Sequence, residues 1–305
     1  MEQPETVPKK VVVVVPAYNE AQKIGEAVAA LRAQAEAMTD VQLLVYVIND
    51  GSSDETGALA TEAGADRVLH HKVNRGLGAA VRTGLSAARD DGADIAVKFD
   101  ADLQHDPADI PKMLQPINDD EADVVYGNRF DRIEYKMPLV RRTGNLVFTR
   151  LMAWLTGWRV QDSQPGILAV SRAYLSNFYL PGDYNYTQQI LLDAYHKGMR
   201  FAHVSVAFRK RVSGKSFVSF RYPFKVLPQI VMVLVGVRPL RVFAPIGLLF
   251  FLFGVVLGCV ELSSYLFGDA AKPVQHVNLV MGTSLFGLQT LFFGLIADLI
   301  VKQRR

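Results

Sequence analysis

The chain has 305 residues, of which half are hydrophobic and 21% are charged, and its formal net charge at pH 7 is +3. It contains one cysteine, Cys259, which excludes an internal disulfide framework. Residues 1–200 have an ordinary charge density, whereas residues 243–260 contain no charged residue. This uneven distribution favours a membrane-attached protein over a wholly soluble one.

The first predicted strand is the β-branched run at residues 11–15, which stops at the segment 16–20. We expect a helix rich in alanine to begin at about Glu20. Residues 1–10 carry two Glu and two Lys, so we expect no signal peptide there. A second strand is predicted at 43–48, and it ends in the polar segment 49–54.

A third strand, predicted at residues 95–99, ends directly at two carboxylates. If the chain stays extended there, Asp100, Asp102 and Gln104 point the same way, because alternate side chains of a strand share a face. Carboxylate and amide oxygens suit Mg²⁺ or Mn²⁺, and a site with so few protein ligands leaves positions for a substrate diphosphate. A solvated acidic turn before a helix at Pro107 is the alternative that these residues alone leave open.

Each of the three strands thus delivers polar residues at its C-terminal end. Ligands bind at that edge in open α/β sheets, because neighbouring loops leave a crevice there. The order of strands, loops and helices therefore predicts an α/β fold with a nucleotide-diphosphate site.

Four motifs in this order resemble family 2 of the inverting glycosyltransferases, namely residues 15–20, 49–54, 74–80 and 100–104. Further segments resemble the polyprenyl-phosphate branch of that family, which includes dolichol-phosphate mannose synthase and undecaprenyl-phosphate sugar transferases. These segments are residues 127–129, 141–145, 162–164 and 211–216. The resemblance covers roughly residues 10–305 and implies a GT-A-type, Rossmann-like mixed sheet followed by membrane helices.

The resemblance also implies roles for individual residues. We expect the nucleotide to lie against Pro16, Tyr18, Glu20 and Asp50, with Arg75 nearby. We expect Asp100, Asp102 and Gln104 to hold Mg²⁺ or Mn²⁺. The acceptor phosphate is expected at Arg129 with Arg141 or Arg142, because a guanidinium donates two hydrogen bonds to one phosphate. Arg211 and Lys215 are expected to neutralise the leaving diphosphate from a flexible lid.

The implied reaction transfers a hexose from a donor of the GDP-mannose or UDP-glucose type to dolichyl or undecaprenyl phosphate, with inversion to a β-linked sugar. A phosphate monoester is already ionised at pH 7, so the reaction needs no general base. Relatives commonly carry a Glu on the helix where this chain has Gln188 and Gln189. This departure argues against a base at that place and against sugar-hydroxyl acceptors.

Two low-charge stretches, 243–260 and 277–297, are long enough with their ends to cross about 30 Å of hydrocarbon. We predict a transmembrane hairpin with spans at about 242–267 and 277–301. Basic residues flank both outer ends of this hairpin: Arg238, Arg241, Lys302, Arg304 and Arg305. This asymmetry places both termini and the catalytic domain in the cytoplasm.

The segment 216–241 interleaves aromatic and basic residues, as in helices that lie in a membrane surface. The predicted division is therefore a catalytic domain at 1–215, juxtamembrane amphipathic helices at 216–241 and the hairpin at 242–305. Residues 200–241 carry nine Lys or Arg and no acidic residue, which favours anionic head groups as partners. We expect no nucleic-acid partner, because the block adjoins apolar segments and lacks a recognised binding motif.

Other functions fit less well. A pyridine-nucleotide dehydrogenase is disfavoured, because residues 76–81 lack the third glycine and do not follow the first strand. A processive polysaccharide synthase would carry a Gln-x-x-Arg-Trp pattern, which neither Trp154 nor Trp158 provides. The histidines have no zinc-site spacing. A transferase acting on another lipid or polysaccharide, and a non-enzymatic scaffold with a transferase-like fold, stay open.

The sequence does not fix the sugar, the nucleotide base, the polyprenyl chain or the oligomeric state. The apolar surface of two spans leaves room for a homo-oligomer.

Overall fold

The structure is a computed structural model that describes residues 8–130, 139–183, 186–208, 239–268 and 271–303. The chain divides into two units, Met1–Val218 and Ser219–Arg305. Of the predicted juxtamembrane segment 216–241, residues 216–238 lie outside the described residues, as do Arg211 and Lys215, whereas residues 239–241 belong to the first long helix of the second unit.

A seven-stranded mixed sheet forms the centre of the first unit, with strand order β3-β2-β1-β4-β6-β5-β7. Strands β1, β2, β3 and β4 are mutually parallel, whereas β6 runs antiparallel to β4 and β5. The strands are β1 (Lys9–Ala17), β2 (Val41–Asn49), β3 (Arg67–His70), β4 (Ile95–Lys98), β5 (Val124–Asn128), β6 (Leu168–Ser171) and β7 (Phe201–Ser205). The predicted α/β sheet is therefore confirmed, and its parallel half carries the three predicted strands.

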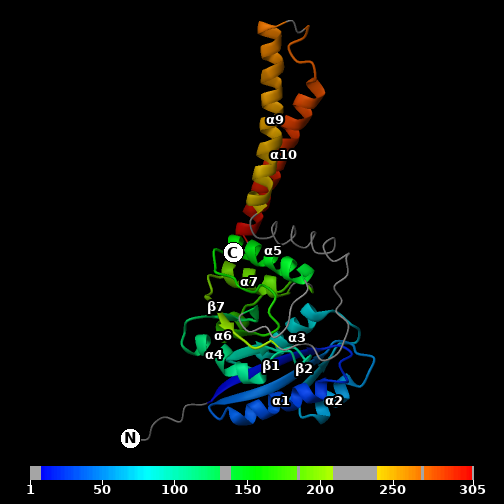
Figure 1. Ribbon diagram of the computed structural model, residues 1–305, viewed down its shortest axis with the longest axis vertical. Helices are drawn as coiled ribbons and strands as arrows, with labels where there is room; N and C mark the ends of the chain where they lie inside the picture. Colours follow the sequence, from blue (N-terminus) through cyan, green and yellow to red (C-terminus); the bar gives the residue numbers. More distant parts are fainter. Residues whose placement is uncertain (1–7, 131–138, 184–185, 209–238, 269–270, 304–305) are drawn as a thin grey trace. The chain divides into compact units, whose positions relative to one another are not determined.

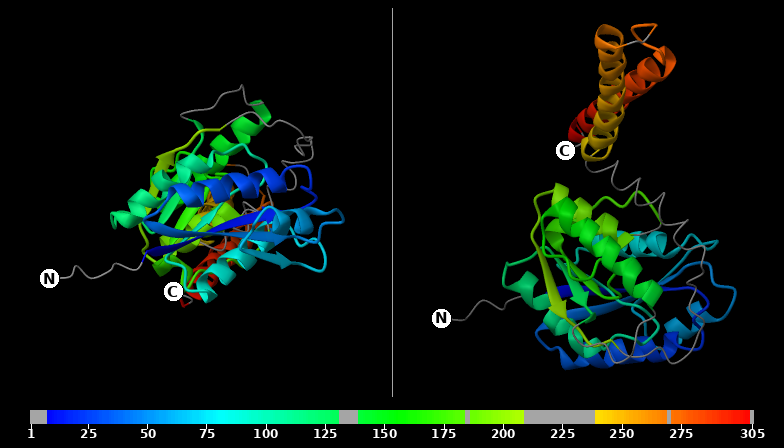
Figure 2. Two further views of the ribbon diagram at one scale, coloured as in Figure 1. Left: turned by 90° about the horizontal axis from the view of Figure 1, so that it is seen from below. Right: turned by 45° about the horizontal axis from the view of Figure 1, so that its top comes forward.

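Helices cover both faces of this sheet (Figures 1 and 2). They are α1 (Ile24–Ala37), α2 (Thr56–Glu62), α3 (Leu77–Asp90), α4 (Ile110–Asn118), α5 (Leu139–Thr156), α6 (Arg172–Leu175) and α7 (Tyr186–His196), with a short 3₁₀ turn at Pro107–Asp109. Helix α1 begins at Ile24 rather than at about Glu20, because residues 20–23 form a turn in which the Glu20 carbonyl accepts from the Lys23 N–H at 2.9 Å.

Strand β1 explains how the two faces are filled. Val11, Val13 and Val15 belong to one buried cluster with residues of α1 and α4. On the opposite face, α3 approaches so closely that a Cβ on Gly84 would lie 2.1 Å from Val14 Cγ1. A continuous apolar run is typical of a strand that is buried on both faces. The packing on both faces holds the C-terminal end of β1 rigidly in place.

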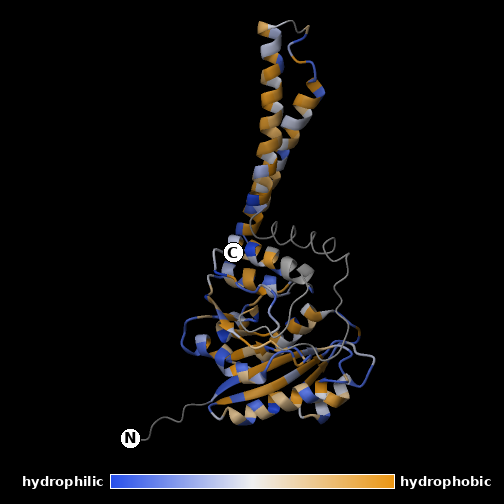
Figure 3. Cartoon of the chain, in the orientation of Figure 1, coloured by the Kyte–Doolittle hydropathy of each residue, from blue (hydrophilic) through white to orange (hydrophobic). Residues whose placement is uncertain are grey.

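The second unit described is a helical hairpin of α9 (Pro239–Phe267) and α10 (Val277–Gln303). At about 1.5 Å per residue, each helix exceeds the roughly 30 Å of a hydrocarbon core. In the most apolar 18-residue stretch of each helix, only 11% of α9 and 17% of α10 is buried inside the structure. Figure 3 shows apolar residues along both helices. Helices that bury their apolar residues in a soluble core would be largely covered, so exposed helices of this length and composition are candidate membrane spans.

Small residues let the two helices of the hairpin approach closely. Gly247 and Gly254 of α9 and Gly287 and Gly294 of α10 are buried in the hairpin. At the loop between the helices, the Glu261 carboxylate accepts from the backbone N–H of Gln275 at 2.7 Å and of His276 at 3.1 Å. Glu261 thereby satisfies amides at the start of α10 that the helix itself leaves unpaired.

Candidate active site

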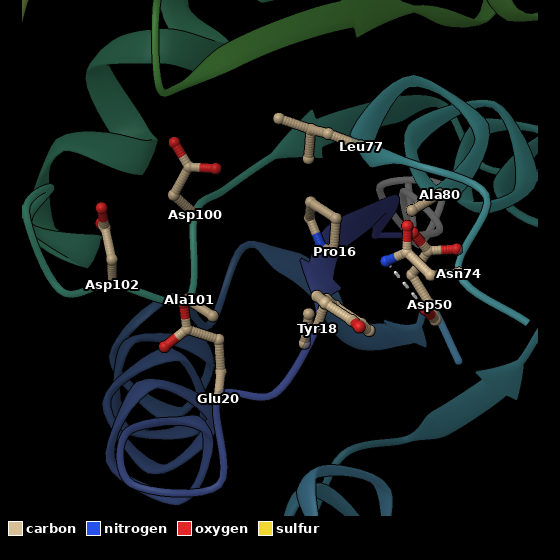
Figure 4. Close-up of a pocket in the computed structure, with 11 residues that line it drawn as sticks. Pro16, Tyr18, Glu20, Asp50, Asn74, Leu77, Ala80, Asp100, Ala101 and Asp102 are labelled. Atoms are coloured by element: carbon tan, nitrogen blue, oxygen red, sulfur yellow. Dashed lines mark hydrogen bonds between the residues drawn. The ribbon is translucent and has the colours of Figure 1, made fainter. Parts of the chain in front are cut away.

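A cavity of about 330 Å³ opens at the C-terminal ends of β1, β2 and β4 (Figure 4). Its lining residues are Pro16, Ala17, Tyr18, Glu20, Asp50, Asn74, Leu77, Ala80, Asp100, Ala101 and Asp102. The structure thus brings together most of the predicted nucleotide-binding residues and both predicted metal-binding carboxylates. It does so at the sheet edge where α/β proteins bind ligands.

The loop after β1 is held by the loop after β2. Asn19 N–H donates to Ser52 Oγ at 3.0 Å, and Ser53 N–H donates back to Asn19 Oδ1 at 2.9 Å. Glu20 N–H donates to Thr56 Oγ1 at 2.9 Å. These bonds fix the backbone on both sides of the cavity mouth, where Tyr18 presents a ring that is 48% exposed.

Asp50 organises the third loop of the cavity. Its buried carboxylate accepts from the backbone N–H of Arg75 at 2.9 Å and of Gly76 at 2.8 Å, and His71 Nδ1 lies 2.6 Å away. Gly76 adopts a φ of 94°, a left-handed conformation that favours glycine. Asp50 therefore positions the turn before α3. Arg75 takes part through its backbone, while its side chain is exposed and outside the cavity lining.

The acidic segment after β4 does not stay extended. The strand ends at Lys98, residues 101–103 turn, and Leu103 has a φ of 61°. The expected alternation of Asp100, Asp102 and Gln104 on one strand face is therefore wrong, because the turn breaks it. The Gln104 N–H donates to Asp102 Oδ1 at 3.1 Å, and the Gln104 side chain is buried and outside the cavity lining.

Lys98 is a buried cation directly beneath this segment. Its side chain is 1% exposed, and Nζ lies 2.5 Å from Asp100 Oδ1 and donates to the Gly166 carbonyl at 2.8 Å. Burial disfavours the charged ammonium, but the neighbouring Asp100 carboxylate outweighs it, so the pKa of Lys98 is raised above its ordinary value. Asp100 thus faces the cavity with one oxygen already paired.

The residues fit a divalent cation that the substrate helps to hold. Asp100 and Asp102 line the same cavity as Glu20, and all three offer hard oxygen donors. Among the described residues, no group of three or more His, Cys, Asp or Glu side chains could hold a metal by itself. This donor set suits Mg²⁺ or Mn²⁺ completed by phosphate oxygens rather than a closed protein site.

His105 lies near the acidic segment, 2% exposed and packed against Phe208 with the ring centroids 5.1 Å apart. Burial lowers the pKa of His105 to about 4, even though Asp100 acts in the opposite direction. The imidazole is therefore neutral at pH 7. His105 does not line the cavity.

Arg129 belongs to a second, deeply buried cluster. Its Nε lies 2.9 Å from Asp162 Oδ2, and the two side chains are 5% and 0% exposed. Asn145 of α5 donates to Asp162 Oδ1 at 3.3 Å, and the Gln164 N–H donates to the same oxygen at 3.0 Å. The cluster fixes the orientation of the guanidinium. The side chain of Arg142, a further predicted acceptor contact, lies outside the described residues.

The two glutamines on α7 lie outside the cavity lining. Gln189 accepts from Gly182 N–H at 3.0 Å and donates to the Gly182 carbonyl at 3.3 Å. Gln188 is buried.

Sequence reasoning assigned no role to Lys98, Asp162 or Asn74. A lysine inside an apolar strand, two residues before an aspartate, is a local signal for the first of these. Asp162 lies in the segment 162–164, which resembles the polyprenyl-phosphate branch. Its partner Arg129 is 33 residues away, and no local sequence pattern pairs the two residues. Asn74 lies in another such motif, and its amide donates to the Asp50 carbonyl at 3.3 Å.

Comparison with known proteins gives consistent matches. The family described as Glycosyl transferase family 2 matches residues 12–178, more than half of the 305 residues. A UDP-N-acetylglucosamine–dolichyl-phosphate N-acetylglucosaminyltransferase of Methanococcus voltae is 35% identical over 55% of this chain and 71% of its own. A dolichyl-phosphate hexose transferase of Haloferax volcanii is 32% identical over 65% of this chain and 82% of its own.

Among solved structures, glucosyl-3-phosphoglycerate synthase from Mycobacterium tuberculosis, in complex with Mn²⁺, UDP and phosphoglyceric acid, superposes with a TM-score of 0.56. The match covers 75% of this chain and 78% of that one at 23% identity. At that identity the likeness establishes the fold alone.

Proposed function

The chain belongs to glycosyl transferase family 2, and from this membership we propose that it transfers a hexose from a nucleotide-diphosphate sugar to a polyprenyl phosphate. The donor is of the GDP-mannose or UDP-glucose type, and the acceptor is dolichyl or undecaprenyl phosphate. The product is a polyprenyl monophosphate sugar with inverted, β configuration, for cell-envelope glycan or protein glycosylation.

The observation that carries this proposal is the composition and place of the cavity. Asp100, Asp102 and Glu20 meet at the C-terminal ends of parallel strands, beside a turn that Asp50 holds. Mg²⁺ or Mn²⁺ held by Asp100 and Asp102 would neutralise the leaving diphosphate. The two dolichyl-phosphate transferases among the relatives support the choice of acceptor.

The protein's own contribution is orientation. The loops after β1 and β2, together with the turn that Asp50 holds, bind the nucleotide. This orients the anomeric carbon of the donor sugar toward the acceptor phosphate. The acceptor phosphate is an ionised nucleophile, which explains why glutamines suffice on α7. Arg129, oriented by Asp162, is proposed to bind that phosphate together with Arg141 or Arg142, and Arg211 and Lys215 to close on the leaving group.

The same lipid acceptor accounts for the hairpin. A polyprenyl chain resides in the bilayer, and we propose that α9 and α10 span that bilayer with both termini and the catalytic unit on the cytoplasmic side. The basic residues at the outer ends of the hairpin support this orientation.

A panel assay tests the proposal. The full-length protein in bilayers is incubated with UDP-glucose, UDP-N-acetylglucosamine or GDP-mannose, Mn²⁺, and undecaprenyl or dolichyl phosphate. We expect one donor class to give a lipid-linked sugar that contains a single phosphate. Formation of a lipid diphosphate sugar, or transfer only to a sugar hydroxyl, would refute the proposed acceptor chemistry.

A further inference from the structure

Lys98 is a buried residue in contact with the cavity residue Asp100, and the proposed transfer leaves it unexplained. Lys98 is the last residue of β4, and its Nζ lies 2.5 Å from Asp100 Oδ1. The same ammonium donates to the Gly166 carbonyl at 2.8 Å, and the ring centroid of Tyr186 is 5.6 Å away. A buried ammonium is costly to desolvate, and this one is stabilised by a carboxylate, a carbonyl and an aromatic ring.

The charged side chains that line the cavity are all acidic. Glu20, Asp50, Asp100 and Asp102 line the cavity, and its lining contains no lysine or arginine among the described residues. Asp50 is already engaged by two backbone amides and His71. Lys98 therefore supplies the buried positive charge next to the carboxylates that are expected to meet a metal.

We propose that Lys98 is a positioning residue that makes metal binding depend on the nucleotide diphosphate. It holds Asp100 Oδ1 and leaves Asp100 only its second oxygen for a metal. Its charge also repels a divalent cation that enters without a counter-anion. The site therefore binds the free cation weakly and binds the cation–diphosphate pair tightly. This inference rests on the proposed donor site but not on the lipid acceptor.

The proposal makes a reciprocal prediction. If a nucleotide diphosphate tightens Mn²⁺ binding by some factor, Mn²⁺ must tighten the nucleotide by the same factor, because the two are linked through one coupling free energy. Removing the charge of Lys98 should strengthen binding of the cation alone and reduce this coupling.

A purely structural role gives a different result. If Lys98 only ties β4 to Gly166, its replacement lowers the melting temperature and leaves the affinity for free Mn²⁺ unchanged. Metal affinity therefore separates the two roles, and it requires no turnover.

The experiment measures Mn²⁺ binding to the full-length protein by the loss of the free-ion electron paramagnetic resonance signal. Titrations are made with and without UDP, and separately with and without GDP. In the wild type, one of the two nucleotides should tighten Mn²⁺ binding at least tenfold. Lys98→Met should bind Mn²⁺ alone at least tenfold more tightly than the wild type.

Three further variants separate the effect of the Lys98 charge from that of its hydrogen bond to Gly166. Lys98→Arg keeps the charge and should retain weak binding of the free cation. Lys98→Gln removes the charge but can still donate to Gly166, and it serves if the methionine variant does not fold. Lys98→Met with Asp100→Asn should lose the gain, because the extra affinity comes through Asp100.

Lys112→Met is the matched control. Lys112 also lies 2.5 Å from an aspartate, Asp109, but its side chain is 51% exposed, and it does not line the cavity. The Lys112→Met variant should bind Mn²⁺ as the wild type does.

Folded Lys98→Met and Lys98→Gln variants that bind free Mn²⁺ no more tightly than the wild type would overturn the inference. So would a wild type in which the bound nucleotide does not tighten Mn²⁺ binding. Failure of both nucleotides to bind would instead refute the proposed donor site, while the titrations with Mn²⁺ alone would still decide the role of Lys98.

Discussion

The two aspartates of the acidic segment have different contacts. Asp100 Oδ1 is paired with the buried Lys98 ammonium, and Asp102 Oδ1 accepts the Gln104 backbone N–H at 3.1 Å. A backbone amide orients a carboxylate without cancelling its charge. The Lys98 ammonium therefore offsets part of the charge of Asp100.

Asp102→Asn removes one formal charge and preserves shape. We expect sugar transfer at saturating Mn²⁺ to fall at least a hundredfold, because a positioned charge in such a site contributes about 3 kcal/mol. Asp106→Asn is the control, since asparagine caps a helix as well as aspartate and should keep the hydrogen bond from Ala108 N–H. Retention of more than about a tenth of wild-type transfer by Asp102→Asn, with full activity of the control, would contradict the metal assignment.

The Arg129–Asp162 pair is both a proposed phosphate contact and a structural element. Because both side chains are buried, Arg129→Ala leaves Asp162 without its charged partner, at a cost of about 3–5 kcal/mol. For a unit of this size we expect the melting temperature to fall by roughly 6–20 °C. Arg89→Ala, which breaks an exposed pair with Asp90, should change it by a few degrees at most.

The expected loss of stability in Arg129→Ala affects how acceptor binding is tested. Loss of transfer in Arg129→Ala would mix lost phosphate binding with lost stability. Arg129→Lys keeps a charge for Asp162 but cannot grip a phosphate with two prongs. A lysine variant that melts near the wild type and needs more lipid phosphate for half-maximal transfer would support the assignment. Unchanged lipid dependence in that variant would move the acceptor site elsewhere.

At the scale of elements, the hairpin depends on backbone-to-backbone approach. A Cβ on Gly287 would lie 2.3 Å from the Phe251 nitrogen and 2.6 Å from the Gly247 carbonyl oxygen. Backbone atoms cannot move aside as a flexible side chain can, so any larger residue must push α9 and α10 apart. Close packing through small residues is the usual means of helix association in membranes.

Gly287→Val should therefore destabilise the hairpin by about 1–3 kcal/mol or more. Gly282→Val is the matched control on the same helix, since a Cβ on Gly282 would meet nothing within 4 Å. The measurement is the temperature at which half of the full-length protein leaves the monodisperse peak in micelles. Equal temperatures for the two variants would show that α9 and α10 are not held by this contact.

At the scale of the whole molecule, the cavity residues and the two candidate membrane spans lie in different units. Every described residue of the cavity lies in Met1–Val218. We expect a fragment of residues 1–241 to bind the sugar nucleotide with an affinity within about threefold of the full-length chain. Transfer to a full-length polyprenyl phosphate should fall at least tenfold more than transfer to a short, soluble one, because the fragment has lost its spans.

Calorimetry without lipid measures the first expectation, and paired transfer assays measure the second. The full-length protein in the same detergent is the reference for both. A fragment that folds, as judged by its melting transition, but does not bind nucleotide would show that the hairpin contributes to the donor site.

The sequence alone determined the features that depend on local pattern. The continuous valines of β1, the polar residues at three strand ends and the two long apolar stretches each specify their element through periodicity and composition. Because parallel strands share an edge, the meeting of Pro16, Asp50 and Asp100 at one cavity also followed from the order of elements. Boundaries shifted where a turn replaced the expected helix or strand, as at residues 20–23 and 101–103.

Only the tertiary structure decided which of these residues are engaged with one another. The bonds from Lys98 to Gly166, from the 75–76 amides to Asp50, and between Arg129 and Asp162 join residues that are 25 to 68 positions apart. No local pattern encodes such pairs, because the partner of a buried charge is set by which strands and loops the packed sheet brings together. For this reason the sequence predicted the acidic ligands, whereas the distant partners of Lys98, Asp50 and Arg129 required the fold.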